Sequence, residues 1–163
     1  SASYNTWMFD ATAGGGPLLS SGIYAVHLLL WLFGSIRKIS GERSTMPNGV
    51  EWQYTLSGET ESGVLFSIKN STRAILDNTA RIFGEKGWVE IPEYWKARKA
   101  IFHFPGKDPE IIEFPCQQDL IYEASHIAKC LQDGLLSSPV VTEELSVSGI
   151  AALETVKANW AEL

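Results

Sequence analysis

Cysteine, positive charge and long apolar runs are all scarce in this 163-residue sequence. Its two cysteines, Cys116 and Cys130, form no CxxC pair and lie near no histidine cluster, which argues against a disulfide framework or a zinc site and favours reduced, mostly buried thiols. Thirteen Lys and Arg against nineteen Asp and Glu give a net charge of -6, the opposite of a nucleic-acid binder's basic patch. Because no charged segment leads into an apolar stretch at the N-terminus, we expect a cytoplasmic protein without a signal peptide.

The sequence does contain enough apolar material for one folded domain. Hydrophobic residues make up 45% and aromatic residues 11% of the chain, more than a disordered protein contains. The length suits a single domain with a sizeable core, so we expect residues 1–163 to fold as one domain. Since the first residue is Ser rather than Met, we also expect the chain to be processed, tagged or part of a longer protein.

One segment, residues 14–34, is far more apolar than the rest. A membrane span needs about 20 continuous apolar residues, and here serine, glycine, tyrosine and histidine interrupt the run. The segment therefore predicts a helix buried in a protein core. Pro17 suits its first turn and Gly34 the position just after its end, while Gly14–Gly16 form a flexible lead-in whose backbone can approach a ligand closely.

The middle of the chain has the alternation of half-buried strands, most clearly in residues 50–57. Six further runs have a similar character and are separated by short turn-rich connections: residues 36–40, 64–68, 78–83, 88–91, 100–104 and 110–114. Two helices follow, the first capped by Asp119 and stopped by Gly134, the second capped by Thr142. This order predicts an α+β fold with an open, predominantly antiparallel sheet covered by helices on one face.

Large aromatic side chains are frequent in the strand region, at Trp52, Tyr54, Trp88 and Trp95. They either belong to the core that faces the helices or form an exposed sheet face that contacts a partner. Sequence alone leaves both interpretations open.

A polar stripe lies on the apolar helix predicted above. At about 100° per residue, Ser20, Tyr24, His27 and Trp31 fall on one side of that helix. Such a stripe must satisfy its hydrogen bonds either internally or by facing a cleft, where a phenol and an imidazole could relay a proton. Gly14–Gly16 do not form a GxGxxG sequence after a strand, so no Rossmann-type dinucleotide site is expected within the chain, and no metal site is expected either.

Three stretches resemble one enzyme family in the same order. GGGPLLSSGIYAVHLLLWLFG is similar to the segment that opens the C-terminal domain of the glucose–fructose oxidoreductase/inositol dehydrogenase (Gfo/Idh/MocA) family. IFGEKGWVEIPEYW resembles a turn and strand of that domain, and YEASHIAKCLQDGLLSSPVVTEELSVSGIAALETV its closing pair of helices. Together they cover most of the chain.

The resemblance implies a two-domain enzyme of which this chain is the C-terminal, substrate-binding and oligomerisation part. Such enzymes bind NAD or NADP in an N-terminal Rossmann domain, which is absent from these residues, and transfer a hydride to or from a sugar, polyol or related diol. A lysine in a Glu-Lys-Pro motif of that first domain assists the proton transfer. The resemblance also implies homo-oligomers formed through the open sheet face, a small-molecule substrate, and no nucleic-acid or membrane partner.

Residue by residue, Tyr24 matches the family's Tyr/His position, which acts as acid/base or as substrate anchor, in the form found in the glucose–fructose oxidoreductase and dihydrodiol dehydrogenase branch. Ser20 stands where the family usually has Asp, so it can bond a substrate hydroxyl but cannot supply charge. The resemblance makes His27 a third substrate-binding candidate, and Gly15 and Gly16 possible cofactor contacts.

Three hypotheses follow for the function. In the first, the chain is the substrate-binding part of an NAD(P)-dependent oxidoreductase and is inactive on its own. In the second, suggested by Ser20, it is a degenerate module that binds a ligand or partner without catalysis. In the third, it is a dimerisation domain with no site.

Overall fold

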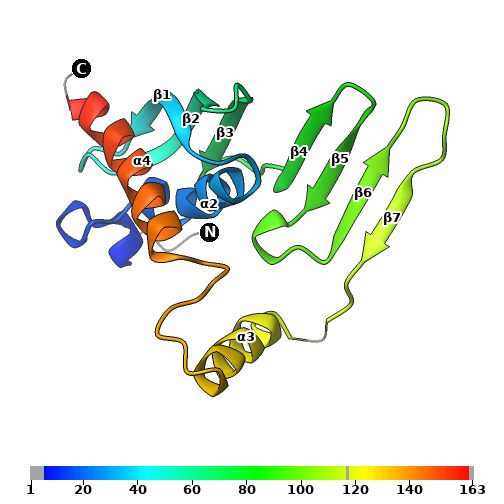
Figure 1. Cartoon of the computed structure of the whole chain (residues 1–163). Coiled ribbons are helices and arrows are strands. Elements are labelled where there is room, and N and C mark those ends of the chain that lie inside the picture. The colour runs from blue at the N-terminus through cyan, green and yellow to red at the C-terminus, as the bar shows by residue number, and fades with distance from the viewer. Residues whose placement is uncertain (1–5, 117, 162–163) are drawn as a thin grey trace. The chain divides into compact units, whose positions relative to one another are not determined.

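A computed structural model describes residues 6–116 and 118–161, and these fall into two compact units (Figure 1). Within the described residues, the first unit holds the chain up to Leu76 and from Pro139 onward, and the second holds Asp77–Ser138.

The first unit is a three-stranded antiparallel sheet with helices on one face. The strand order is β1-β2-β3, and each strand pairs with its neighbour in sequence. Its elements are the 3-10 turns η1 (Trp7–Phe9) and η2 (Ala11–Ala13), helices α1 (Pro17–Ser20), α2 (Gly22–Phe33) and α4 (Glu143–Ala161), and strands β1 (Ile36–Thr45), β2 (Glu51–Thr60) and β3 (Leu65–Ser71).

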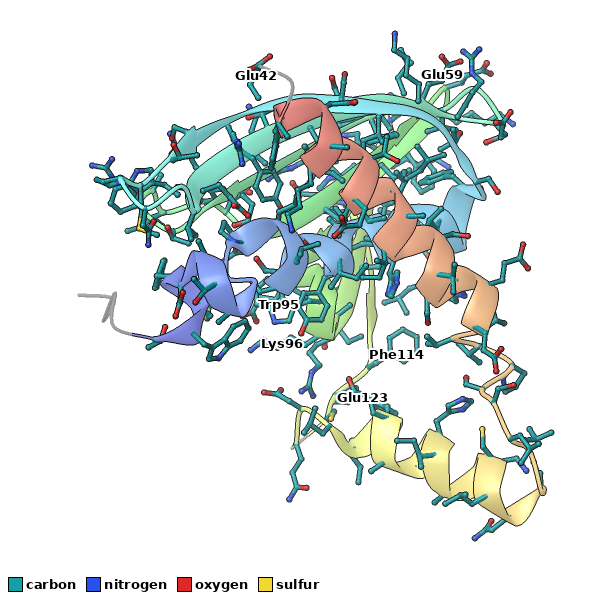
Figure 2. All side chains as sticks on the ribbon, turned by 90° about the vertical axis from the view of Figure 1, so that its left-hand side faces the viewer. Glu42, Glu59, Trp95, Lys96, Phe114 and Glu123 are labelled. Carbon is teal, nitrogen blue, oxygen red and sulfur yellow. The ribbon has the colours of Figure 1, made fainter. Side chains whose placement is uncertain are left out.

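Alternation along the strands decides which face of this sheet is buried. Tyr54 and Leu56 point to the face that α2 and α4 cover, and Gln53, Thr55 and Ser57 between and beside them are exposed. The core contains Leu18, Val26, Leu30, Ile39, Tyr54, Leu56, Leu153, Val156 and Trp160. The uncovered face is polar, and Glu42 and Glu59 project from it in Figure 2.

Helix α4 is tied to the sheet and to α2 by two different contacts. The indole N–H of Trp160 donates a hydrogen bond of 2.7 Å to the carbonyl of Gly41 in β1. Gly149 lies against α2 so closely that a Cβ there would stand 2.6 Å from the His27 ring. The absence of a side chain at Gly149 therefore permits the approach of the two helices.

The second unit is a four-stranded antiparallel meander followed by a helix. It contains β4 (Thr79–Gly84), β5 (Gly87–Pro92), the 3-10 turn η3 (Tyr94–Lys96), β6 (Lys99–His103), β7 (Glu110–Glu113) and α3 (Ile121–Gln132). One face of its sheet is mostly apolar and also includes Glu110, the partner of Phe102; its apolar residues are Ala80, Ile82, Val89, Ile91, Ala100, Phe102 and Ile112. On the other face the rings of Trp88 and His103 stack with centroids 3.8 Å apart, and Arg81 pairs with Glu90.

The predicted α+β class with open antiparallel sheets is confirmed, and all seven expected strands are present. In the described residues they form two sheets. Tyr54 belongs to the helix-facing core, which confirms for this residue the first of the two interpretations of the aromatic side chains. Trp52 packs beside a smaller cluster of Phe9, Met46 and Val50. Trp95 is partly exposed.

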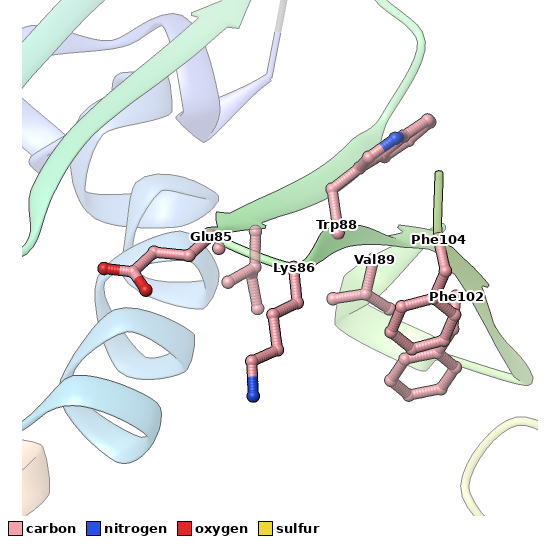
Figure 3. Close-up of a pocket in the computed structure, with 9 residues that line it drawn as sticks. Glu85, Lys86, Trp88, Val89, Phe102 and Phe104 are labelled. Carbon is pink, nitrogen blue, oxygen red and sulfur yellow. The ribbon is translucent and has the colours of Figure 1, made fainter. Parts of the chain in front are cut away.

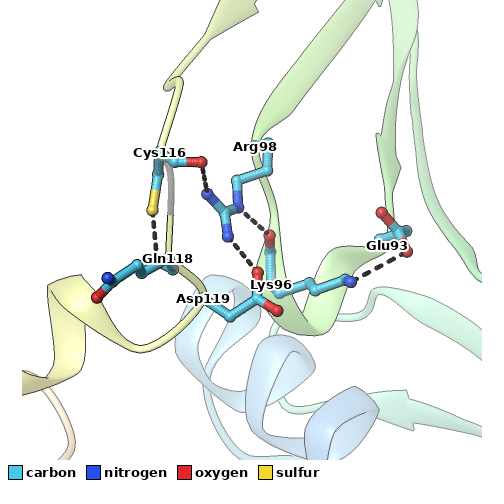
Figure 4. A network of polar contacts seen from close by, with 6 residues as sticks. All are labelled: Glu93, Lys96, Arg98, Cys116, Gln118 and Asp119. Atoms are coloured by element: carbon cyan, nitrogen blue, oxygen red, sulfur yellow. Dashed lines mark hydrogen bonds and ion pairs between the residues drawn. The ribbon is translucent and has the colours of Figure 1, made fainter.

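Two details of the helix prediction differ from the structure. The apolar segment forms two helices, since α1 ends at Ser20 and α2 begins at Gly22. The expected Asp119 cap is wrong, because Leu120 holds the N-cap position of α3 and Asp119 pairs with Arg98 (Figure 4). The Thr142 cap is confirmed, since its hydroxyl accepts the N–H of Leu145 at 3.1 Å.

Membrane-spanning capacity can be stated for helices in the described ranges. No single helix among them has both the length and the apolar character to cross a bilayer. The required length and apolar character are reached only by two consecutive segments taken together, Ala11–Ser20 and Gly22–Phe33, which are bent by 43° relative to each other.

Candidate functional site

The glycine-rich lead-in folds back on the residues before it. The N–H groups of Gly15 and Gly16 donate to the carbonyls of Asp10 and Met8 at 2.9 and 2.8 Å. A Cβ on Gly15 would stand 2.5 Å from the carbonyl oxygen of Trp7, so this position has no room for a side chain. Packing within the chain therefore accounts for these glycines, and their N–H groups are already used.

Glu51 anchors the beginning of α1. Its side chain is buried, and Oε1 accepts the backbone N–H of Leu18 at 2.9 Å. Gly16, with φ +127°, lies directly against this carboxylate, where a Cβ would be 2.3 Å from Oε1. Only glycine adopts this backbone conformation readily and leaves room for the carboxylate, so Gly16 and Glu51 form one structural unit.

A short break separates the helix that bears Ser20 from the helix that bears Tyr24. Ser20 Oγ donates to the carbonyl of Gly16 at 2.8 Å, and Ser21 Oγ donates to that of Pro17 at 3.1 Å. Asn70 in β3 donates to Ser21 Oγ at 2.7 Å and thereby ties the break to the sheet. The Ser20 hydroxyl therefore donates its hydrogen to a carbonyl of its own chain, and its oxygen lone pairs remain available as acceptors.

Tyr24 faces outward from α2 and is 51% exposed. In the described part of the chain its hydroxyl has no hydrogen-bond partner, so the phenol is available to a bound molecule. Trp31, two turns further on, is also exposed. Both residues belong to the stripe that the sequence predicted.

His27 turns toward α4 instead. Its ring packs against Gly149, and its Nε2 is buried without a hydrogen-bond partner among the described residues. Burial lowers the pKa of His27 from its ordinary value, because a charged imidazolium would lose its hydration there. The structure therefore separates the predicted stripe into exposed Tyr24 and Trp31 and an inward, neutral His27.

Two of the cavities in the described residues differ in their relation to these side chains. One of about 110 Å³ lies in the first unit beside the Glu51 anchor, and its wall includes Gly14, Gly15, Arg43, Glu51, Lys157 and Trp160. The other, of about 440 Å³, lies in the second unit along Ile82, Val89, Phe102 and Phe104 (Figure 3). None of the predicted site residues lines the larger cavity, whose wall is mostly apolar.

Sequence reasoning missed Glu51 and Asn70. Strict alternation with Tyr54 and Leu56 assigns Glu51 to the uncovered face of the sheet. The pairing register shifts between Ser44 and Thr45, directly opposite the beginning of β2, and Glu51 is buried there. A bulge of this kind leaves no clear signal in one sequence. Among the described residues, no group of three or more His, Cys, Asp or Glu side chains could hold a metal ion.

Replacing the Glu51 anchor should destabilise the first unit. Glu51→Ala leaves the buried N–H of Leu18 without a partner, and we expect a loss of about 1–3 kcal/mol in the free energy of unfolding, measured in urea. Glu51→Gln keeps a carbonyl acceptor and should lose less. Glu42→Ala, on the exposed face, is the control and should stay within about 0.5 kcal/mol of the unchanged chain. Equal stability of Glu51→Ala and the unchanged chain would contradict the anchor.

Protonation of His27 should destabilise the chain in mild acid. Because the folded-state pKa is lowered, the unfolded chain binds the proton first as the pH falls below about 6.5. The free energy of unfolding should therefore decline as the pH falls from neutral into mild acid. His27→Leu cannot be protonated, so its unfolding free energy should decline less over the same range. Identical pH dependence of the two chains would show that His27 is not the group responsible.

Comparison with known proteins assigns the family. The model of the GFO/IDH/MocA C-terminal domain matches residues 1–90. Trans-1,2-dihydrobenzene-1,2-diol dehydrogenase from Mus musculus is 34% identical over 143 residues, which are 81% of this chain and 42% of the relative. The chain thus spans less than half the length of the curated relatives it matches.

Solved structures show the same fold at low sequence identity. KijD10, a 3-ketoreductase from Actinomadura kijaniata in complex with NADP and TDP-benzene, aligns with TM-score 0.79 and 15% identity over 96% of this chain and 50% of its own. Levoglucosan dehydrogenase in complex with NADH and levoglucosan aligns with TM-score 0.73 and 17% identity over 94% and 52%. With the family model covering more than half of the residues and a relative above 30% identity, the chain belongs to the Gfo/Idh/MocA family and corresponds to its C-terminal domain.

Proposed function

We propose that the chain is the substrate-binding part of an NAD(P)-dependent oxidoreductase that acts on the CH–OH group of a diol, polyol or sugar. Family membership supports the reaction class, and the names of the relatives support the substrate class, since they include a dihydrobenzenediol dehydrogenase and a levoglucosan dehydrogenase. The observation on which the proposal rests is the free, half-exposed phenol of Tyr24, at the position that matches the family's acid/base residue.

In this proposal Tyr24 exchanges a proton with the reacting hydroxyl. When the alcohol is oxidised, the phenolate oxygen accepts the hydroxyl proton; when the carbonyl is reduced, the phenol donates it. A cation beside the phenolate would stabilise it, and the resemblance assigns this part to a lysine outside these residues.

Ser20 and His27 have different parts in the same site. Ser20 lies at the end of α1. Because its hydroxyl hydrogen is donated to the carbonyl of Gly16, its oxygen can accept a hydrogen bond from a substrate hydroxyl. His27 was expected to bind substrate, and that remains a proposal. Its packing against Gly149 supports an additional role in the contact between α2 and α4.

The cofactor in this proposal is NAD or NADP, which supplies or accepts the hydride when bound. The glycine loop of this chain does not fit a phosphate cradle, because the N–H groups of Gly15 and Gly16 both donate within the chain. Contacts of these glycines with a cofactor would be made through their Cα atoms. We therefore assign nucleotide binding to an N-terminal domain beyond these residues and expect the chain alone to be inactive.

Homo-oligomerisation through an open sheet face is the remaining part of the proposal. The uncovered face of the first sheet is rich in serine, threonine and charged side chains, while the second sheet offers Trp88, His103 and Phe83 on one face. Aromatic side chains of this kind are enriched in interfaces, which favours the second sheet.

A degenerate, non-enzymatic module is the alternative function. Its support is Ser20, which replaces the family's usual aspartate and bonds to the carbonyl of Gly16. Without a carboxylate at this position, the site could bind a ligand without turning it over.

Removal of the Tyr24 hydroxyl should abolish most of the activity. In the full-length enzyme, assayed with NAD and NADP against trans-dihydrobenzenediol and levoglucosan, Tyr24→Phe should lower kcat by about a hundredfold or more, since it removes the proton acceptor. Tyr122→Phe alters another exposed tyrosine, on α3, and should leave kcat unchanged. Unchanged turnover in Tyr24→Phe would remove this residue from the mechanism.

Ser20→Asp distinguishes the alternative within the same assay. A full-length protein that is silent and gains dehydrogenase activity through Ser20→Asp would establish the degenerate module and contradict the enzyme proposal. An active protein that loses activity through the same change would support a substrate site adapted to serine.

A further inference from the structure

A cysteine, a histidine and a serine meet in the second unit, on and beside α3. The Sγ of Cys130 lies 3.5 Å from the Nε2 of His126, and the same Nε2 lies 2.7 Å from the Oγ of Ser138. His126 and Cys130 are four residues apart in one helix, so their side chains share a face. All three residues are half-buried.

The arrangement places an imidazole base beside the thiol. The imidazole is held from two sides, by its helix and by Ser138 in the segment after it. With the ring proton on Nδ1, Nε2 is an acceptor that the Ser138 hydroxyl at 2.7 Å and the Cys130 thiol at 3.5 Å share. A thiolate, rather than a thiol, is the nucleophile in cysteine chemistry, and a neighbouring histidine is the usual group that produces it.

We propose that Cys130 is a reactive thiol, activated by His126, that forms mixed disulfides with small-molecule disulfides. In this exchange the thiol proton passes to His126 Nε2 and Sγ forms a bond to one sulfur of the reagent. The disulfide bond of the reagent breaks, and its second sulfur leaves as a thiolate that carries the electron pair. The modification is independent of the dehydrogenase proposal, since none of these residues belongs to that site.

Cys116 provides an internal comparison within the same unit. It is also half-buried and free, so accessibility is similar, and both thiols are more exposed than the composition suggested. Its Sγ donates to the carbonyl oxygen of Gln118 at 2.6 Å, as Figure 4 shows. A carbonyl oxygen accepts this hydrogen bond but does not act as a base, so the contact of Cys116 differs in kind from that of Cys130.

The two cysteines can be followed separately in one molecule. The folded chain is treated with dithiobis(nitrobenzoate), an aromatic disulfide, for increasing times, quenched with acid, and digested with trypsin. Cleavage after Lys107, Lys129 and Lys157 places Cys116 in peptide 108–129 and Cys130 in peptide 130–157. We expect Cys130 to react at least about tenfold faster than Cys116. Equal rates, or faster reaction of Cys116, would overturn the proposal.

Variants test whether His126 is the cause. His126→Gln retains a side chain able to bond Ser138 but removes the base, and it should bring the rate of Cys130 down to about that of Cys116. A Cys130 rate unchanged by His126→Gln would overturn the role of His126. The comparison of Cys130 with Cys116 in the unchanged chain does not depend on whether a variant folds. In denaturant, the two cysteines should react at equal rates. A tenfold difference that persists in denaturant would contradict an origin in the folded structure.

Discussion

The buried hydrogen bond from the Leu18 N–H to Glu51 is the contact on which the arrangement of the candidate site depends. It joins the first strand-paired residue of β2 to the first turn of α1 across 33 residues of sequence. A carboxylate removed from water needs such a hydrogen-bond partner. Because Gly16 has no side chain, the Glu51 carboxylate can lie directly against the beginning of α1. From this anchor the chain runs through one turn of helix, breaks at Ser21 and restarts at Gly22.

The break separates Ser20, at the end of α1, from Tyr24 and His27 on α2. One uninterrupted helix would place Ser20, Tyr24 and His27 on a common stripe. In the structure, Asn70 ties the break to β3, Tyr24 points outward, and His27 packs against the glycine of α4. The phenol proposed to exchange protons is thus free, while the imidazole is kept neutral within a helix–helix contact. The consequence is an exposed phenol on one side of α2 and an imidazole packed in the contact between α2 and α4 on another.

Sequence patterns predicted the parts of this fold that depend on regular repetition. The alternation of residues 50–57 predicted β2, and the glycine at position 34 predicted the end of α2, where it adopts φ +80°. Burial of Glu51 could not be predicted, because a register shift reverses the face expected from alternation. The interruption at Ser21 was also invisible, since serine is compatible with helix and its partner Asn70 lies 49 residues away. The Asp119 cap was predicted wrongly because the side chain of Asp119 forms an ion pair with Arg98, which is 21 residues away in the sequence.

Hydrogen exchange at the Leu18 amide tests the central claim most directly. If the Glu51 carboxylate holds this N–H in a buried contact, the Leu18 amide should exchange as slowly as the core amides of β2, and Glu51→Ala should speed its exchange far more than theirs. Exchange of Leu18 in the unchanged chain at the rate of an exposed loop, or slow exchange unaffected by Glu51→Ala, would contradict the account.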